Sequence, residues 1–151
     1  MRITVNGHTH VLESPLLTPL LHVLREELHI TSPKAGCQQG SCGTCTVIVN
    51  GEARRSCLLP VVTLDGAVIT TLEGIGTPDD LSPLQASFLE KSAAQCGFCT
   101  PGFITAATAL LADNPSPSRS EITHALSGHY CRCTGYVKII EAIEAVAGGA
   151  Q

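Results

Sequence analysis

Aromatic and charged residues are scarce in this sequence of 151 residues, and their scarcity excludes several classes of protein. The chain has no Trp, two Tyr and three Phe, so stacking platforms for nucleic-acid bases are not expected. Charged residues make up 15% and apolar residues 44%, which is not the composition of a disordered chain. A formal net charge of −4 gives no reason to expect a polyanionic partner. The composition predicts a folded protein of one domain or two small ones.

Long apolar runs and a secretory signal are also missing. The N-terminal stretch MRITVNGHTH begins directly with an alternating strand pattern and has no apolar core or cleavage site. The apolar stretch LLTPLLHVL is short and is interrupted by Pro19, so it is not expected to span a membrane. We therefore predict a cytoplasmic protein, and disulfide frameworks are rare in that compartment because thiols stay reduced there.

Common catalytic and nucleotide-binding motifs are absent as well. No G-x-G-x-x-G follows a strand, and neither a P-loop nor a G-x-S-x-G elbow occurs. The six His are scattered, and the acidic pairs at 26–27 and 79–80 are expected to be solvated. We predict that no residue of this chain acts as a catalytic acid, base or nucleophile.

Cysteine, in contrast, is abundant: the chain has eight, in two sets of four. The first set has the spacing C-x4-C-x2-C followed by a more distant Cys, which is the plant-type [2Fe–2S] spacing. Its members are Cys37, Cys42, Cys45 and Cys57. Gly36, Gly40 and Gly43 permit turns with positive φ, through which the loop can direct its amide N–H groups toward sulfur. A predicted hairpin at Asn50-Gly51 would return Cys57 to the loop.

The second set consists of a C-x2-C pair and, 32 residues after it, a C-x-C pair. Its members are Cys96, Cys99, Cys131 and Cys133. Each pair directly precedes a predicted helix start, at Thr100 and at Thr134. Two helix N-termini would therefore direct their partial positive charge at one place. Together with Arg132 they would suit a negatively charged cluster.

From the residues alone, two four-cysteine zinc sites remain the alternative. The tight loop of the first set is poor zinc-ribbon spacing and favours iron–sulfur, whereas the second set separates the two metals less clearly. A Rieske centre is not expected because no Cys-x-His pair is present.

The periodicity changes from strand-like to helical along the chain. Asn6-Gly7 and Asn50-Gly51 predict two β-hairpins, GAVITTLEG predicts a further strand, and the leucines of 19–29 predict a helix. After a Gly- and Pro-rich linker, four helices are predicted. They begin at or next to Pro83, Thr100, Ser118 and Thr134, and the third is expected to end at Gly128. The fold class is α+β.

Two long stretches of the chain resemble a known family. KAGCQQGSCGTCTVIVNGEARRSCL and AQCGFCTPGFITAATALLADNPSPSRSEITHALSGHYCRCTGYVKIIEAI are similar to the two signatures of the iron–sulfur small subunit of molybdenum hydroxylases. That family includes the small subunits of xanthine dehydrogenase, aldehyde oxidoreductase and carbon monoxide dehydrogenase. The resemblance implies a plant-type ferredoxin-like β-grasp domain at 1–75, a linker at 76–84 and a four-helix [2Fe–2S]-binding domain at 85–151.

The resemblance also implies an electron-transfer role. Electrons would pass from the molybdopterin cytosine dinucleotide of a partner large subunit through two [2Fe–2S] clusters to a flavin subunit with FAD, or to an external acceptor such as a cytochrome. The second set would lie nearer the pterin and the first set further out. Gln95 matches the family residue that approaches the pterin. The alternatives are a two-zinc structural protein and a free-standing ferredoxin-type carrier.

The sequence departs from the family pattern at His129, where Asn usually precedes CRCTGY. One hypothesis is that a protonated imidazole near the inner cluster favours its reduced state, which would make the potential depend on pH between about 5 and 8. The alternative interpretation is a turn histidine exposed to water.

Overall fold

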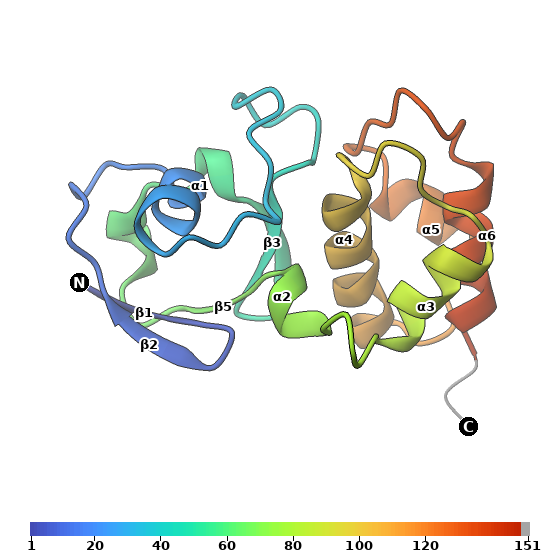
Figure 1. Cartoon of the computed structure of the whole chain (residues 1–151), viewed down its shortest axis with the longest axis horizontal. Helices are drawn as coiled ribbons and strands as arrows, with labels where there is room; N and C mark the ends of the chain where they lie inside the picture. Colours follow the sequence, from blue (N-terminus) through green and yellow to red (C-terminus); the bar gives the residue numbers. More distant parts are fainter. Residues whose placement is uncertain (149–151) are drawn as a thin grey trace.

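The structure is a computed structural model that describes residues 1–148, with a sheet half and a helical half side by side (Figure 1). Residues 149–151, the end of the helical domain predicted at 85–151, lie outside the described residues. The strands are β1 (Arg2–Val5), β2 (His8–Val11), β3 (Thr46–Val49), β4 (Glu52–Arg55) and β5 (Val68–Thr70). The α-helices are α1 (Leu20–His22), α2 (Leu72–Ile75), α3 (Pro83–Glu90), α4 (Thr100–Asp113), α5 (Arg119–Ala125) and α6 (Val137–Val146). The other helical turns are η1 (Val23–Glu27), η2 (Ser56–Leu58) and η3 (Val61–Leu64).

All five strands form one mixed sheet in the order β2-β1-β5-β3-β4. Neighbours are antiparallel except β1 and β5, which run parallel. Both predicted hairpins are confirmed, and all four turn residues, at 6–7 and 50–51, have positive φ. Such turns match the right-handed twist of the flanking strands. The α+β fold class is confirmed.

The leucine-rich segment forms a helix whose buried residues pack with the sheet. α1 continues into η1, a π-helical turn in which the N–H of Leu28 donates to the carbonyl of Val23 at 3.0 Å. Leu20 and Leu24 are fully buried in the same apolar cluster as residues of β1, β3 and β5. The helix predicted for 19–29 is therefore confirmed but shorter, since His29 has a positive φ of 57° and ends it.

The caps predicted for the helical half are confirmed. The hydroxyl of Ser82 accepts from the N–H of Gln85, and the Gln85 side chain accepts from the N–H of Ser82. Ser118 and Glu121 form the same capping box at α5. α4 begins at Thr100, as predicted.

The predicted start of α6 and the predicted end of α5 are both wrong. α6 begins at Val137 rather than directly after Thr134, because Tyr136 has a left-handed backbone with φ of 68° that a right-handed helix cannot include. α5 ends at Ala125 rather than at Gly128, and a turn covers the residues between them.

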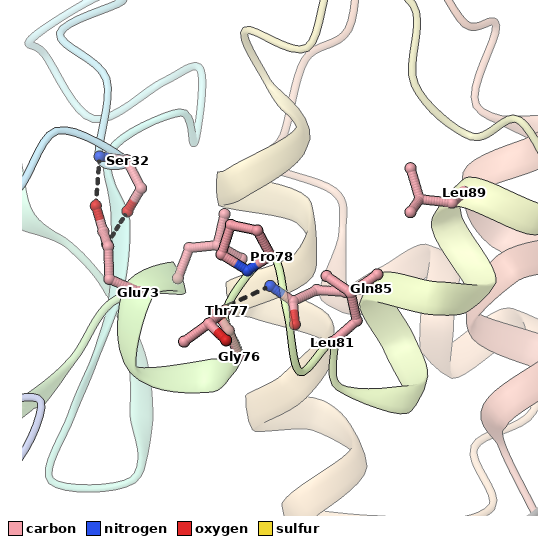
Figure 2. A pocket seen from close by; sticks show the side chains of 9 residues that line it. Ser32, Glu73, Gly76, Thr77, Pro78, Leu81, Gln85 and Leu89 are labelled. Atoms are coloured by element: carbon pink, nitrogen blue, oxygen red, sulfur yellow. Dashed lines mark hydrogen bonds between the residues drawn. The ribbon is translucent and has the colours of Figure 1, made fainter.

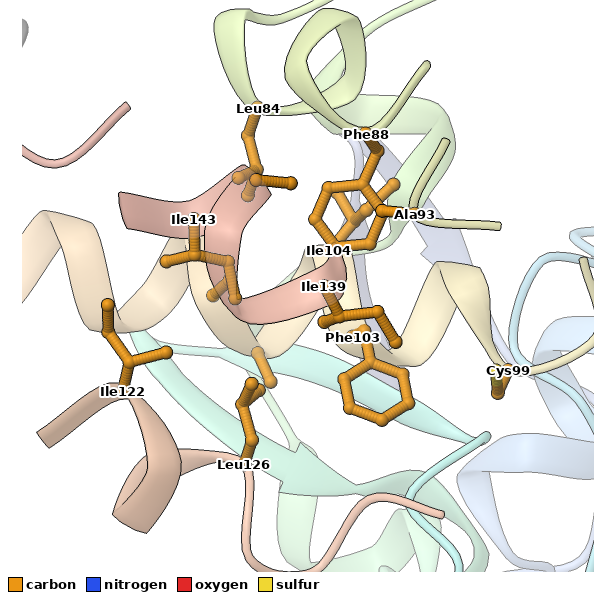
Figure 3. Packing of buried hydrophobic residues seen from close by; sticks show 13 residues of the cluster. Leu84, Phe88, Ala93, Cys99, Phe103, Ile104, Ile122, Leu126, Ile139 and Ile143 are labelled. Atoms are coloured by element: carbon orange, nitrogen blue, oxygen red, sulfur yellow. The ribbon is translucent and has the colours of Figure 1, made fainter. Parts of the chain in front are cut away.

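The helical half has its own apolar cluster, drawn in Figure 3. Phe103 of α4, Ile122 of α5 and Ile139 and Ile143 of α6 are at most 1% exposed. Fully burying such side chains contributes roughly 1.5–3 kcal/mol each. Cys99 lies at one end of this cluster, so the core packing reaches the second set of cysteines.

Hydrogen bonds hold the segment between the halves, residues 73–85, in place. The Glu73 carboxylate accepts from the backbone N–H and the hydroxyl of Ser32, and the Gln85 amide donates to the carbonyl of Gly76 at 3.4 Å (Figure 2). These residues line a largely apolar cavity of about 600 Å³. Within residues 1–148, no helix is long and apolar enough to cross a membrane.

Candidate metal centres

The loop that carries the first three cysteines stands at the top of Figure 1, beside the upper end of β3. Gly40 and Gly43 have φ of 83° and 74°, as predicted for residues that turn the loop. The same prediction is wrong for Gly36, because the additional left-handed residue of the loop is Gln38. Gly36 is needed for space instead, since a Cβ there would lie 2.9 Å from the Sγ of Cys42.

Amide groups of this loop point at sulfur. The N–H groups of Gln39 and Cys42 donate to the Sγ of Cys37 at 3.5 Å and 3.3 Å. Burial alone would raise the pKa of the Cys37 thiol, but hydrogen bonds from Ser41 and from these two amides lower it to about 6. The loop therefore stabilises a thiolate, which is the form of cysteine that binds metals.

Cys45 and Cys57 form the inner side of the first site. They are 3% and 8% exposed, and the hairpin of β3 and β4 brings them together as the sequence predicts. The hydroxyl of Ser56 donates to the Cys45 carbonyl at 2.7 Å. Burial and the neighbouring Cys45 thiol raise the pKa of Cys57 to about 11. Metal binding by Cys57 must therefore displace its proton.

The second set is assembled at the N-terminal end of α4. Cys99 directly precedes this helix, and burial, together with the Cys131 thiol, raises its pKa to about 12. Burial would likewise raise the pKa of Cys131, but the N–H and hydroxyl of Thr134, which donate to its Sγ at 3.4 Å and 3.1 Å, lower it. The prediction that a helix begins directly after the second pair is wrong, because α6 begins only at Val137. The Arg132 side chain is exposed.

The eight thiols are arranged in four pairs. The pairs in contact are Cys37 with Cys42, Cys45 with Cys57, Cys96 with Cys133, and Cys99 with Cys131. Within residues 1–148, no three Cys, His, Asp or Glu side chains converge so that they could hold one metal ion. A [2Fe–2S] cluster has two irons, each of which takes two protein ligands. Two pairs at each site thus fit a two-iron cluster.

The two sites are joined by direct contacts, and in Figure 1 both loops lie along the upper edge of the molecule. The N–H of Tyr130, next to Cys131, donates to the carbonyl of Cys42 at 3.0 Å. α4 approaches the first loop so closely that a Cβ on Gly102 would lie 2.4 Å from the carbonyl oxygen of Gly43. The halves are therefore packed together at the cysteines.

His129 lies inside this junction. It is 4% exposed, its Nε2 is 2.9 Å from the hydroxyl of Thr46, and its ring centre is 5.4 Å from that of Phe103. The interpretation of an exposed turn histidine is therefore wrong. Burial and the nearby Arg55 guanidinium lower the pKa of His129 to about 4. A neutral imidazole across pH 5 to 8 argues against the hypothesis that its protonation tunes the cluster in that range.

Gln95 lies on the surface beside the second set. Its side chain is exposed, and its amide donates to the carbonyl of Cys133 at 3.1 Å. This bond satisfies a backbone group, and among residues 1–148 no hydrogen bond is found to the side-chain carbonyl oxygen of Gln95.

Comparisons with known proteins agree with two clusters. The family described as "2Fe-2S iron-sulfur cluster binding domain" matches residues 3–67, and that described as "[2Fe-2S] binding domain" matches residues 71–144. The nicotinate dehydrogenase small FeS subunit of Eubacterium barkeri is 46% identical over 143 residues, which are 95% of this chain and 91% of that one.

Solved structures give the same result. Quinoline 2-oxidoreductase from Pseudomonas putida 86 matches with a TM-score of 0.91 and 45% identity, over 97% of this chain and 92% of the matched chain. Aldehyde oxidoreductase from Desulfovibrio desulfuricans matches with a TM-score of 0.94 and 44% identity, over 97% of this chain and only 16% of that chain. The chain therefore belongs to the family of [2Fe–2S] iron–sulfur subunits of molybdenum hydroxylases.

Proposed function

We propose that this chain transfers electrons from a molybdopterin-containing large subunit, through its two [2Fe–2S] clusters, to an acceptor. The observation that carries the proposal is the arrangement of eight thiols as four pairs in two joined sites. Bound there, the clusters supply one-electron redox chemistry. The chain's own residues bury the sulfur atoms, donate N–H groups to them and hold the two sites in contact.

We assign the ligands and domains accordingly. Cys37, Cys42, Cys45 and Cys57 would hold one cluster in a ferredoxin-like β-grasp domain of residues 1–75. Cys96, Cys99, Cys131 and Cys133 would hold the other in a helical domain of residues 85–151. Residues 76–84 would link them. The separate apolar clusters of the two halves support this division.

What each site exposes supports the proposed direction of transfer. At the second site Cys96 and Cys133 are exposed, and the Gln95 side chain beside them is exposed as well. We therefore place this site against the pterin, with Gln95 as a contact. The first site would pass electrons outward to a flavin subunit or to an external acceptor such as a cytochrome. The cytoplasmic location stays a prediction.

The decisive measurement is low-temperature EPR of the dithionite-reduced protein, with iron and zinc determined on the same sample. We expect two distinguishable S = ½ signals and about four irons per chain, the content of two [2Fe–2S] sites. A colourless, EPR-silent protein with two zinc ions would overturn the proposal in favour of a structural protein. Purification from its native host distinguishes the free-standing carrier, because a subunit copurifies with its large partner.

A further inference from the structure

The guanidinium of Arg55 lies at the junction of the two cysteine sites. From the end of β4, its Nη1 donates to the hydroxyl of Thr46 at 3.0 Å, and its Nη2 donates to the carbonyl of Gly128 at 2.9 Å. Thr46 follows Cys45 directly in the sequence, and Arg55 itself is two residues before Cys57. One side chain thus binds segments of both sites.

This positive charge has no anionic partner among the described residues. The ion pairs found within residues 1–148 do not include Arg55, and its Nε is buried without a hydrogen-bond partner. A partly buried charge without a counter-charge is costly, and proteins normally pair it. The position therefore suits an anion that no carboxylate of the described residues supplies.

The hydrogen bonds of His129 show that it does not neutralise the charge of Arg55. The hydroxyl of Thr46 has one proton, which it donates to the carbonyl of Gly43 at 2.7 Å. Its lone pairs then accept from Arg55 and from Nε2–H of His129, at 3.0 Å and 2.9 Å. This places a proton on Nε2, while Nδ1 is buried without a hydrogen-bond partner among the described residues. His129 and Thr46 hold the guanidinium in place without neutralising it.

We propose that Arg55 is a positioning residue whose fixed positive charge balances the clusters at both sites and thereby favours their reduction. A four-thiolate [2Fe–2S] unit carries a formal charge of roughly −2 when oxidised and roughly −3 when reduced. A fixed cation beside it stabilises the more negative state more strongly, because the interaction scales with charge. This inference rests on the proposed electron-transfer function.

The test is a potentiometric titration of the complex, followed by EPR, on wild type, Arg55→Gln and Arg55→Lys. In Arg55→Gln we expect the equilibrium constant for reduction of each cluster to fall about tenfold, which is about 59 mV for one electron. Arg55→Lys keeps the charge and should stay within about threefold of wild type. The matched control is Arg54→Gln, on the neighbouring residue of β4, whose exposed side chain pairs with Glu52; no shift is expected.

Each outcome decides the proposal. Unchanged potentials in a loaded Arg55→Gln protein would overturn it, as would an Arg55→Lys protein that behaves like Arg55→Gln. If Arg55→Gln fails to retain iron while Arg55→Lys retains it, the charge is what the sites require, and the proposal is supported. Loss of iron from both variants would assign Arg55 a purely structural role. If wild type itself lacks two EPR signals, the proposed function has failed, whatever the variants show.

Discussion

The two cysteine sites differ in how the chain assembles them. Three cysteines of the first site lie within one loop of ten residues, and a single hairpin returns the fourth. The second site joins two pairs that are 32 residues apart, with α4 and α5 between them in the chain, and the packing of these helices with α6 determines whether the pairs meet. The first site is therefore encoded locally, while the second depends on the folded core of its half.

The sites nevertheless share one arrangement. Each has one pair of thiols that is more buried than the other. In the first site Cys45 and Cys57 are buried, while Cys37 and Cys42 are half-buried. In the second site Cys99 is buried and Cys131 half-buried, while Cys96 and Cys133 are exposed. An electron carrier needs this compromise, because burial protects a cluster while an exposed edge allows a partner to approach. The comparison predicts that the sites load independently but communicate through their junction.

The largest effect is expected from substitutions that remove a ligand from one site at a time. Cys57→Ser should remove the first cluster alone, and Cys133→Ser the second alone, because the ligand sets do not overlap. In each variant iron should fall from about four to about two per chain, with the loss of one of two EPR signals. Far-UV circular dichroism checks that each variant stays folded. If either single substitution abolished both signals, independent loading would be wrong.

A smaller effect is expected from overfilling the junction between the sites. Gly102→Ala places a methyl group 2.4 Å from the carbonyl oxygen of Gly43, so α4 must shift away from the first loop. We expect a loss of about 1–3 kcal/mol in the free energy of unfolding, the usual cost of overpacking. In an open helix the same change would stabilise by about 1 kcal/mol, so the sign itself is informative.

Chemical denaturation measures this loss, and the magnetic interaction between the two reduced clusters reports on their separation. Gly66→Ala is the control: Gly66 has a positive φ of 75°, but among the described residues no atom beyond its chain neighbours lies within 4 Å of the position that a Cβ would take. It should cost stability through backbone strain and leave the interaction unchanged. A Gly102→Ala protein as stable as wild type would show that the close approach is not needed.

Local patterns in the sequence are sufficient to predict much of this structure. The Asn-Gly turns and the two capping boxes predict features that the structure contains. The start of α6 is not predictable in this way, because it depends on the left-handed Tyr136, whose hydroxyl accepts from the N–H of Cys131 at 3.0 Å. That contact belongs to the folded loop and leaves no local pattern.

The contacts at the junction of the two sites are not predictable from the sequence for the same reason. Arg55 and Gly128 are 73 residues apart, and Thr46 and His129 are 83 residues apart, so no periodicity connects them. The sequence feature that points to Arg55 is its position as a basic residue two positions before Cys57, in a chain with few charges. In the sequence His129 is only a departure from the family pattern, and its burial in the structure changes its interpretation.

The smallest predicted effect concerns the first half alone. The carboxylate of Glu73 in α2 accepts hydrogen bonds from Ser32, which precedes the first cysteine loop, and from Thr71. Burial would raise the pKa of Glu73, but these bonds outweigh it and hold the pKa below 4.5. A carboxylate with a lowered pKa contributes stability above about pH 4.5, and that contribution is lost as the pH falls through the folded-state value.

Glu73→Gln should therefore lower the melting temperature by a few degrees at pH 7, and the difference from wild type should shrink on acidification below pH 4.5. Thermal unfolding followed by circular dichroism at several pH values measures this. Glu121→Gln is the matched variant in the helical half, where a glutamine can still complete the capping box with Ser118. A difference between wild type and Glu73→Gln that stayed constant down to pH 3 would mean that Glu73 acts through packing rather than charge. If the difference closes, protonation of the Glu73 carboxylate itself weakens its hydrogen bonds to Ser32, and with them the support of the segment that precedes the first cysteine loop.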